Sequence, residues 1–204
     1  MIKESKYTER QVEIIEAATK RIDNHGIQEL TIKNLAADIF LSEAALYRHF
    51  KSKNDILVAL LRYSILEMRN RIDVISSDDQ LNPVEKIIGV FNSQLESFVA
   101  KPAIVSVIFS EGIFQFNKEL SSILKEMMDM MHEYISMLVE QGQNQNRIRK
   151  SIGSGTQTTI IMGSMRFTVL KWKISGHQSD LVKEGNTVLN GILKMVTKSS
   201  ANEN

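Results

Sequence analysis

The spacing of apolar residues constrains this chain most, because it follows the period of an α-helix along most of the sequence. From Leu57 to Ile75 apolar side chains recur at steps of four, four, three, four and three residues. Only two prolines, Pro83 and Pro102, interrupt the 204 residues, and no alternation of β-branched residues marks a strand. We therefore predict an all-α fold.

Capping and turn residues predict where the helices begin and end. Thr8 begins a first helix and Gly26 ends it, which predicts a helix over 8–25. Further helices are predicted over 32–38, 42–48, 55–76, 83–100, 117–141, 156–175 and 178–197, with an apolar segment at 103–116, a loop at 142–155 and a frayed tail at 199–204. The two shortest helices have a brief break between them, which is typical of a helix-turn-helix at about 31–50.

Composition excludes some classes of function and leaves others open. The absence of cysteine excludes disulfides and thiolate chemistry, and a net charge of +1 gives no overall argument for nucleic acid. Locally, residues 31–53 hold more basic than acidic side chains: Lys33, Arg48, Lys51 and Lys53 against Asp38 and Glu43. No membrane-spanning run and no apolar signal segment is present, so we expect a cytoplasmic protein.

Enzyme and metal chemistry find little support in the sequence. The common nucleotide-binding, serine-hydrolase and zinc-protease motifs are absent. One helix carries a metal-like spacing, formed by Glu126, Asp129, His132 and Glu133. A di-iron bundle needs two such motifs, so a solvated helix face explains this one better. We predict no catalytic residue, no metal and no cofactor.

The most specific stretch lies between Gly26 and Leu57 and contains Leu46-Tyr47-Arg48-His49-Phe50-Lys51-Ser52-Lys53. Over residues 8–60 this pattern resembles the TetR family of bacterial transcriptional regulators. The resemblance implies a DNA-binding domain at 1–52, joined by a long helix to an effector-binding and dimerisation domain at 53–204. One departure is Phe40, which stands where the family most often has a turn glycine.

The residues expected at DNA follow from the helix-turn-helix and from the resemblance. Hydroxyls at helix N-termini can hold phosphate oxygens, and a carboxylate or small apolar side chain at the tip of the second helix can contact base edges. The candidates are Thr31, Lys33, Ser42, Glu43, Ala44, Ala45, Tyr47, Arg48, His49 and Lys53. Thr31 and Ser42 also serve as helix caps, and Tyr47 could instead close the small core.

The second domain is expected to hold a ligand pocket. Methionine and phenylalanine gather in its helices, which suits either an adaptable apolar pocket or a solid core. The candidate pocket residues are Phe91, Phe98, Phe109, Met127, Met131, Tyr134 and Met165. No charged residue appears in the apolar stripes, so we expect a hydrophobic effector rather than an anionic one, with His132, Glu111 and Arg166 as polar handles.

The last two helices are expected to form a homodimer interface, as in the family, and a two-fold dimer reads two half-sites. The candidates are Ile160, Ile161, Ser164, Phe167, Leu189, Ile192 and Val196. The predicted function is a DNA-binding repressor that a small molecule releases from a palindromic operator. Two alternatives remain: a helical protein that acts through protein partners without an operator, and a helical-bundle carrier or metal protein.

Overall fold

The computed structural model describes residues 7–110 and 117–197, which form helices joined by turns without a strand among them. The predicted all-helical architecture is confirmed. In chain order the elements are α1 (Glu9–His25), η1 (Ile27–Glu29), α2 (Ile32–Asp38), α3 (Glu43–Tyr47), α4 (Lys53–Ser76), α5 (Pro83–Ala100), α6 (Pro102–Ile108), α8 (Lys118–Asn144), α9 (Ser154–Ile174) and α10 (Leu181–Val196).

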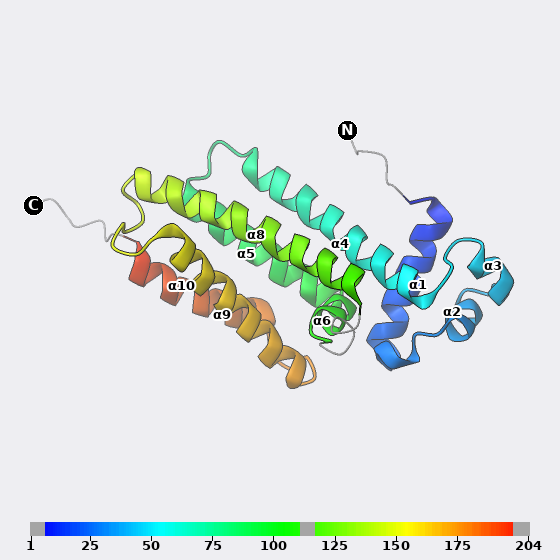
Figure 1. Cartoon of the computed structure of the whole chain (residues 1–204). Coiled ribbons are helices and arrows are strands. Elements are labelled where there is room, and N and C mark those ends of the chain that lie inside the picture. The colour runs from blue at the N-terminus through cyan, green and yellow to red at the C-terminus, as the bar shows by residue number, and fades with distance from the viewer. Residues whose placement is uncertain (1–6, 111–116, 198–204) are drawn as a thin grey trace, which may run out of the picture. The chain divides into compact units, whose positions relative to one another are not determined.

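The described residues pack into two compact units, and Figure 1 follows the chain through both. The first unit takes its residues from Met1–Leu66 and Lys101–Leu124. The second takes them from Glu67–Ala100 and Lys125–Asn204. The helices α4 and α8 each contribute residues to both units.

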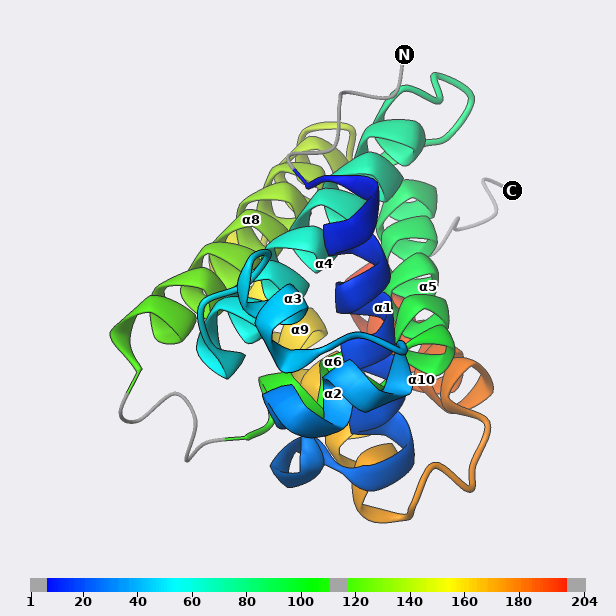
Figure 2. The ribbon, with the colours of Figure 1, turned by 90° about the vertical axis from the view of Figure 1, so that its right-hand side faces the viewer.

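The first unit is built around α1, with α2 and α3 together on one side of it (Figures 1 and 2). A capping box begins α1: the Thr8 hydroxyl accepts from the Gln11 amide at 3.2 Å, and the Gln11 side chain accepts from the Thr8 amide at 3.0 Å. Gly26 ends the helix at φ +81°, a conformation that favours glycine. The core of this unit includes Ile14, Ile15, Ala18, Ile22, Leu30, Leu35, Leu46 and Phe50.

The second unit packs α10 against α5 and α9. Gly185 of α10 allows a close approach, because a Cβ there would lie 2.3 Å from the Leu95 Cδ1 atom of α5. Buried side chains from four helices fill the core, among them Ile87, Phe91, Leu95, Leu138, Trp172, Leu189 and Leu193. The bundle therefore depends on a glycine at the α5–α10 crossing.

The predicted bounds of the loop at 142–155 and the predicted start of the last helix are wrong. The loop predicted at 142–155 is shorter, because α8 continues to Asn144 and α9 begins at Ser154. Gly142 lies buried in the last turn of α8, where a Cβ would stand 2.6 Å from the Ile148 Cδ1 atom, so glycine there lets the loop fold back onto the helix. The last helix begins at Leu181 rather than at 178, because the Asp180 carboxylate caps it by accepting from the Lys183 amide at 2.9 Å.

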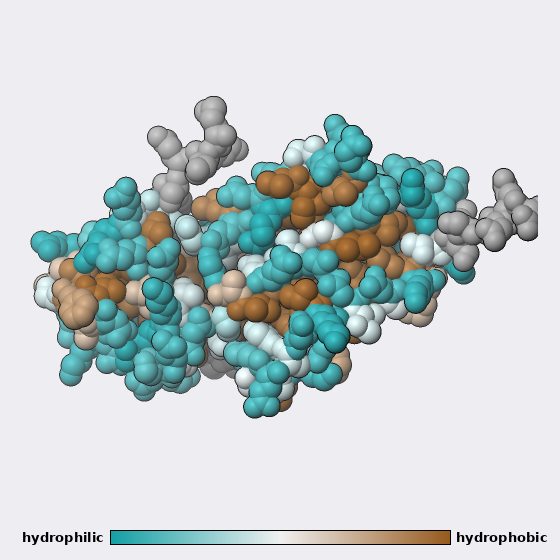
Figure 3. Space-filling view, turned by 180° about the vertical axis from the view of Figure 1, so that it is seen from behind, coloured by the Kyte–Doolittle hydropathy of each residue, from teal (hydrophilic) through white to brown (hydrophobic). Residues whose placement is uncertain are grey.

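The apolar segment predicted at 103–116 forms α6 only as far as Ile108, and residues 111–116 and the tail at 199–204 lie outside the described residues. Within the described ranges no helix is long and apolar enough to cross a membrane. Apolar residues do reach the surface in patches framed by hydrophilic ones, as the face in Figure 3 shows.

Candidate DNA-binding surface and effector region

The short helix α3 presents one face to solvent. Its N-cap is Ser42, whose hydroxyl accepts from the Ala45 amide at 3.1 Å. Leu46 is fully buried and fixes the rotation of the helix, so Glu43, Ala44 and Tyr47 point outward. These three, with the exposed Arg48 that follows, are the side chains that a nucleic acid can reach; Ala45 is half-buried.

The helix α2 is anchored in the same way. The Thr31 hydroxyl caps it by accepting from the Asn34 amide at 3.1 Å, while Leu35 and Ala36 turn into the core. Thr31 and Lys33 are both exposed. An exposed hydroxyl beside free helix amides is a typical phosphate contact.

The segment after α3 is held by hydrogen bonds. The Ser52 hydroxyl accepts from the Asp55 amide at 3.1 Å, and the Asp55 carboxylate accepts from the Lys51 amide at 3.0 Å, which together begin α4. The half-buried His49 has its carbonyl oxygen 3.4 Å from the Gln11 Nε2 donor of α1. The backbone that carries the basic residues is therefore fixed to α1 and α4.

Lys53 lies at the first position of α4 and reaches back to the first residue of η1. Its Nζ donates to the Ile27 carbonyl oxygen at 3.0 Å. Burial lowers the pKa of Lys53, and the negative charge of Glu29 partly offsets that effect. An ammonium group has three donors, so this bond orients Lys53 and leaves donors for a phosphate oxygen.

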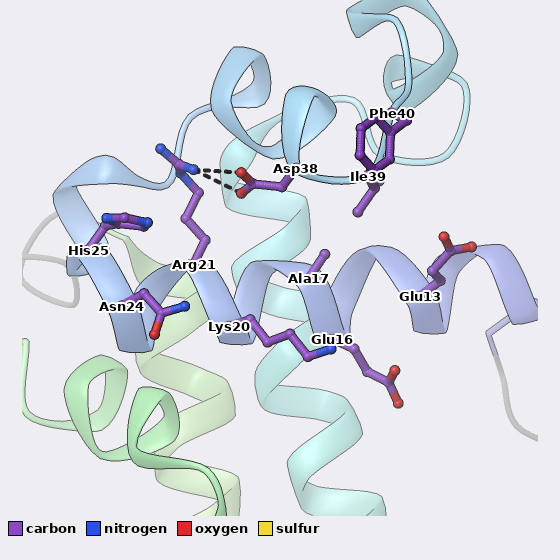
Figure 4. Close-up of a pocket in the computed structure, with 10 residues that line it drawn as sticks. All are labelled: Glu13, Glu16, Ala17, Lys20, Arg21, Asn24, His25, Asp38, Ile39 and Phe40. Carbon is purple, nitrogen blue, oxygen red and sulfur yellow. Dashed lines mark hydrogen bonds and ion pairs between the residues drawn. The ribbon is translucent and has the colours of Figure 1, made fainter.

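The local charge favours an anionic partner. Asp38, the acidic residue of α2, is paired with Arg21 of α1, whose Nη1 lies 2.8 and 2.9 Å from the two carboxylate oxygens (Figure 4). This pair also ties α2 to α1, and it neutralises one of the two acidic side chains in 31–53. Glu43 then stands alone against the four basic residues of that segment.

Phe40 occupies the turn between α2 and α3 with φ +54° and its side chain 97% exposed. The turn therefore has a positive φ at a residue other than glycine, and the Phe40 ring is not packed in a core. The ring stands at one end of an open groove of about 470 Å³ between α1 and the turn (Figure 4). A non-glycine residue in this conformation carries backbone strain.

The predicted interface residues fall into two groups. Ile161, Leu189, Ile192 and Val196 are buried within the chain itself. Ile160 and Phe167 of α9 are 43% and 69% exposed, whereas Ser164 is half-buried. An exposed apolar stripe repeats every seven residues along α9 at Ile160, Phe167 and Ile174, and along α10 at Val188 and Met195.

The predicted pocket residues are also divided. Phe91, Met127 and Met131 are buried in the second unit, and Phe98, Tyr134 and Met165 are half-buried there. Phe109 belongs to the first unit. Among the predicted polar handles, His132 is half-buried, Arg166 is exposed and Glu111 lies outside the described residues.

Sequence reasoning missed a polar seam between α4 and α5. Arg71 of α4 is half-buried and its Nη2 donates to the Gln94 Oε1 atom of α5 at 3.1 Å. A signal was available, because Arg71 lies three residues after Met68 and four before Ile75, within the apolar stripe. In the part of the chain that is described, no cluster of three His, Asp or Glu residues could hold a metal ion.

Two family models between them match most of the chain. The model of the bacterial regulatory proteins of the tetR family matches residues 14–60, and that of the YsiA-like protein C-terminal region matches residues 58–195. The fatty acid metabolism regulator protein of Bacillus subtilis (strain 168) is 22% identical over 178 residues, covering 87% of this chain and 91% of that protein. The nucleoid occlusion factor SlmA of Vibrio campbellii is 27% identical over 138 residues, covering 67% and 70%.

The fold is also found among solved structures. The crystal structure of the transcriptional regulator FadR from Bacillus subtilis, in complex with stearoyl-CoA, superposes with a TM-score of 0.74 at 21% identity, covering 89% of this chain and 97% of that one. The chain is therefore a DNA-binding transcriptional regulator of the ligand-responsive class, and it belongs to the TetR family. Its C-terminal part is of the YsiA-like kind. This family consists of regulators rather than enzymes.

Proposed function

We propose that the chain is a homodimeric repressor that occupies a palindromic operator in the cytoplasm and leaves it when an apolar small molecule binds. Residues 1–52 contact DNA and residues 53–204 bind the effector and the second protomer. The observation that carries the proposal is the exposed face of α3, where a buried Leu46 turns Glu43, Ala44 and Tyr47 outward beside four basic side chains.

The DNA contacts divide by chemistry. Thr31, Ser42, Tyr47, His49 and Lys53 donate to phosphate oxygens, which position the protein without reading sequence, and Lys33 and Arg48 add positive charge. Glu43 can accept from cytosine N4, and Ala44 or Ala45 can contact a thymine methyl group. The base reader with the sharpest signature is therefore Glu43.

The effector class is proposed from the interior of the second unit and from the relatives. Buried methionine and phenylalanine side chains form an adaptable apolar interior. The relative named as a fatty acid metabolism regulator and the structure titled as a complex with stearoyl-CoA support a ligand with a long acyl chain. The ligand releases DNA only if it binds the released conformation more tightly than the bound one.

The dimer interface is proposed on the heptad stripe of α9 and α10. Ile160 and Phe167 of the predicted set lie on this stripe, and Ile174, Val188 and Met195 join them. At Gly163 and Gly191 a Cβ would meet no atom of the described residues within 4 Å, so a partner helix could approach there closely. A two-fold dimer then presents two copies of α3 to half-sites about 34 Å apart.

The test is a comparison of three variants on a set of operator sequences. Glu43→Ala should alter the ranking of operators, whereas Tyr47→Ala and Lys53→Met should weaken binding to all of them to a similar degree. Filter binding at fixed salt measures each affinity. Equal loss on every operator after Glu43→Ala would exclude Glu43 as a base reader.

A further inference from the structure

Arg71 is a half-buried cation whose side-chain hydrogen bond goes to a neutral partner rather than to a carboxylate. Its Nε atom is buried and has no hydrogen-bond partner within the described residues. Its Nη2 donates to Gln94, whose side chain is neutral and itself only 8% exposed. Burying a guanidinium is costly unless an anion pairs with it, so this arrangement calls for a functional reason.

The contacts between α4 and α5 fix how the seam is aligned. Ile75 of α4 is in contact range of Gly89 of α5, at 3.6 Å from where a Cβ would stand, and Arg71 bonds Gln94, so the two helices run antiparallel. Asn92 of α5 also has a buried Oδ1 atom without a partner in the described part of the chain, but it lies two residues from Gln94 and so faces another side of the helix. The atom of the seam that calls for an acceptor is therefore the Arg71 Nε atom.

The guanidinium geometry specifies which group fits. The Nε and Nη2 hydrogens of arginine lie on one edge and match the two oxygens of a carboxylate, forming two parallel charge-assisted bonds. At present Gln94 Oε1 occupies half of that edge. A carboxylate that replaced it would satisfy both donors and neutralise the buried charge. Burial lowers the pKa of Arg71, and the negative charge of Glu67, one turn earlier on α4, opposes that shift.

The surroundings specify the rest of the ligand. Arg71 is flanked on α4 by the buried Met68 and Ile72, and Gln94 on α5 is flanked by the buried Phe91 and Leu95. A ligand that reaches this polar seam must therefore carry a mostly apolar body. We infer that Arg71, with Gln94 beside it, binds the carboxylate of a long-chain aliphatic acid. This inference rests on the effector-binding role proposed above, and it replaces the expectation of a purely hydrophobic effector.

The chain offers a matched control for the test. Arg69 lies two residues earlier on α4, is 51% exposed and pairs with Glu126 at 3.2 Å on the surface. Arg69→Met and Arg71→Met remove the same charge from the same helix. A third variant, Gln94→Glu, places a carboxylate beside the guanidinium and should occupy the site from within.

The measurement is equilibrium dialysis of the full-length protein with dodecanoate, dodecan-1-ol and dodecanoyl-CoA. Wild type and Arg69→Met should bind dodecanoate at least tenfold more tightly than the alcohol, because two charge-assisted bonds separate the ligands. Arg71→Met and Gln94→Glu should reduce that preference to about twofold or less while binding of the alcohol stays unchanged. Thermal melts establish that each variant is folded at the temperature of the dialysis, so that a lost preference for the acid reflects the site rather than unfolding.

Three results would overturn the inference: an undiminished preference for the acid in Arg71→Met, equal binding of acid and alcohol by wild type, or binding of dodecanoyl-CoA alone. Gel shifts of operator DNA separate this outcome from the proposed function. If a ligand releases the operator equally well from wild type and Arg71→Met, the repressor function stands and the carboxylate site is excluded. If the acid binds in an Arg71-dependent way but the protein binds no operator, the carboxylate site stands and the repressor function is excluded.

Discussion

Replacing Phe40 by glycine tests how the turn of the helix-turn-helix is built. The side chain is 97% exposed, so its removal uncovers almost no apolar surface, and the stability change must come from the backbone. At φ +54° a non-glycine residue costs about 1–2 kcal/mol relative to glycine. Glycine also lowers the free energy of unfolding by about 0.4–1 kcal/mol, because it gives the unfolded chain more conformational freedom. Alanine keeps the strain and supplies the matched control.

We therefore expect Phe40→Gly to be more stable than Phe40→Ala by about 1 kcal/mol. In a chain of this size that difference raises the unfolding temperature by roughly 2–4 °C. Calorimetry of the two variants and wild type measures it. Equal melting of the glycine and alanine variants would show that the turn is unstrained. A loss of about 3 kcal/mol or more in both would show that the ring is packed in a core.

Three further perturbations address DNA binding, the dimer and the bundle. Lys53→Met should reduce the slope of log affinity against log salt concentration by about 2 for a dimer, because each protomer loses one phosphate contact. Lys125→Met, on the surface of α8, is the control and should leave that slope unchanged. Salt titrations of DNA binding measure both slopes, and an unaltered slope in Lys53→Met would remove Lys53 from the phosphate contacts. Phe167→Glu should shift the protein to monomers in sedimentation velocity, with the exposed Thr159→Glu, on another face of α9, as the control for added charge. An intact dimer in Phe167→Glu would exclude the stripe as the interface. Gly185→Ala should lower the free energy of unfolding in urea by about 1–3 kcal/mol, because the alanine Cβ would stand 2.3 Å from the Leu95 Cδ1 atom. A variant as stable as wild type would contradict the close α5–α10 crossing.

The sequence was sufficient to predict the helices, because their apolar period and caps are local properties. The capping box at Thr8 and the caps at Thr31 and Ser42 appear in the structure as predicted. The ends of α8 and α9 could not be located in this way. Gly142 looks like a loop residue in sequence, whereas in the structure it lies in the last turn of α8 and lets Ile148 pack onto the helix.

The same division between local and tertiary information applies to the candidate sites. The exposed face of α3 follows from the helical position of Leu46 alone. Some predicted interface residues of α9 and α10 are buried and others are exposed. Which are which depends on the faces that the two helices turn toward α5 and toward each other, and the spacing of apolar residues does not specify those faces. Arg71 was overlooked because a single charge in an apolar stripe is easily assigned to solvent, and only its partner on α5 shows that it turns inward.

The central claim is that the chain is an operator-binding dimer, and a selection of genomic DNA fragments with purified full-length protein at about 150 mM salt tests it most directly. Sequencing of the retained fragments should yield one recurring palindrome with half-sites about one helical turn or more apart, and Glu43→Ala should change the enriched bases. Retained DNA without a shared palindrome, from protein shown to be folded and dimeric, would contradict the claim and favour an action through protein partners.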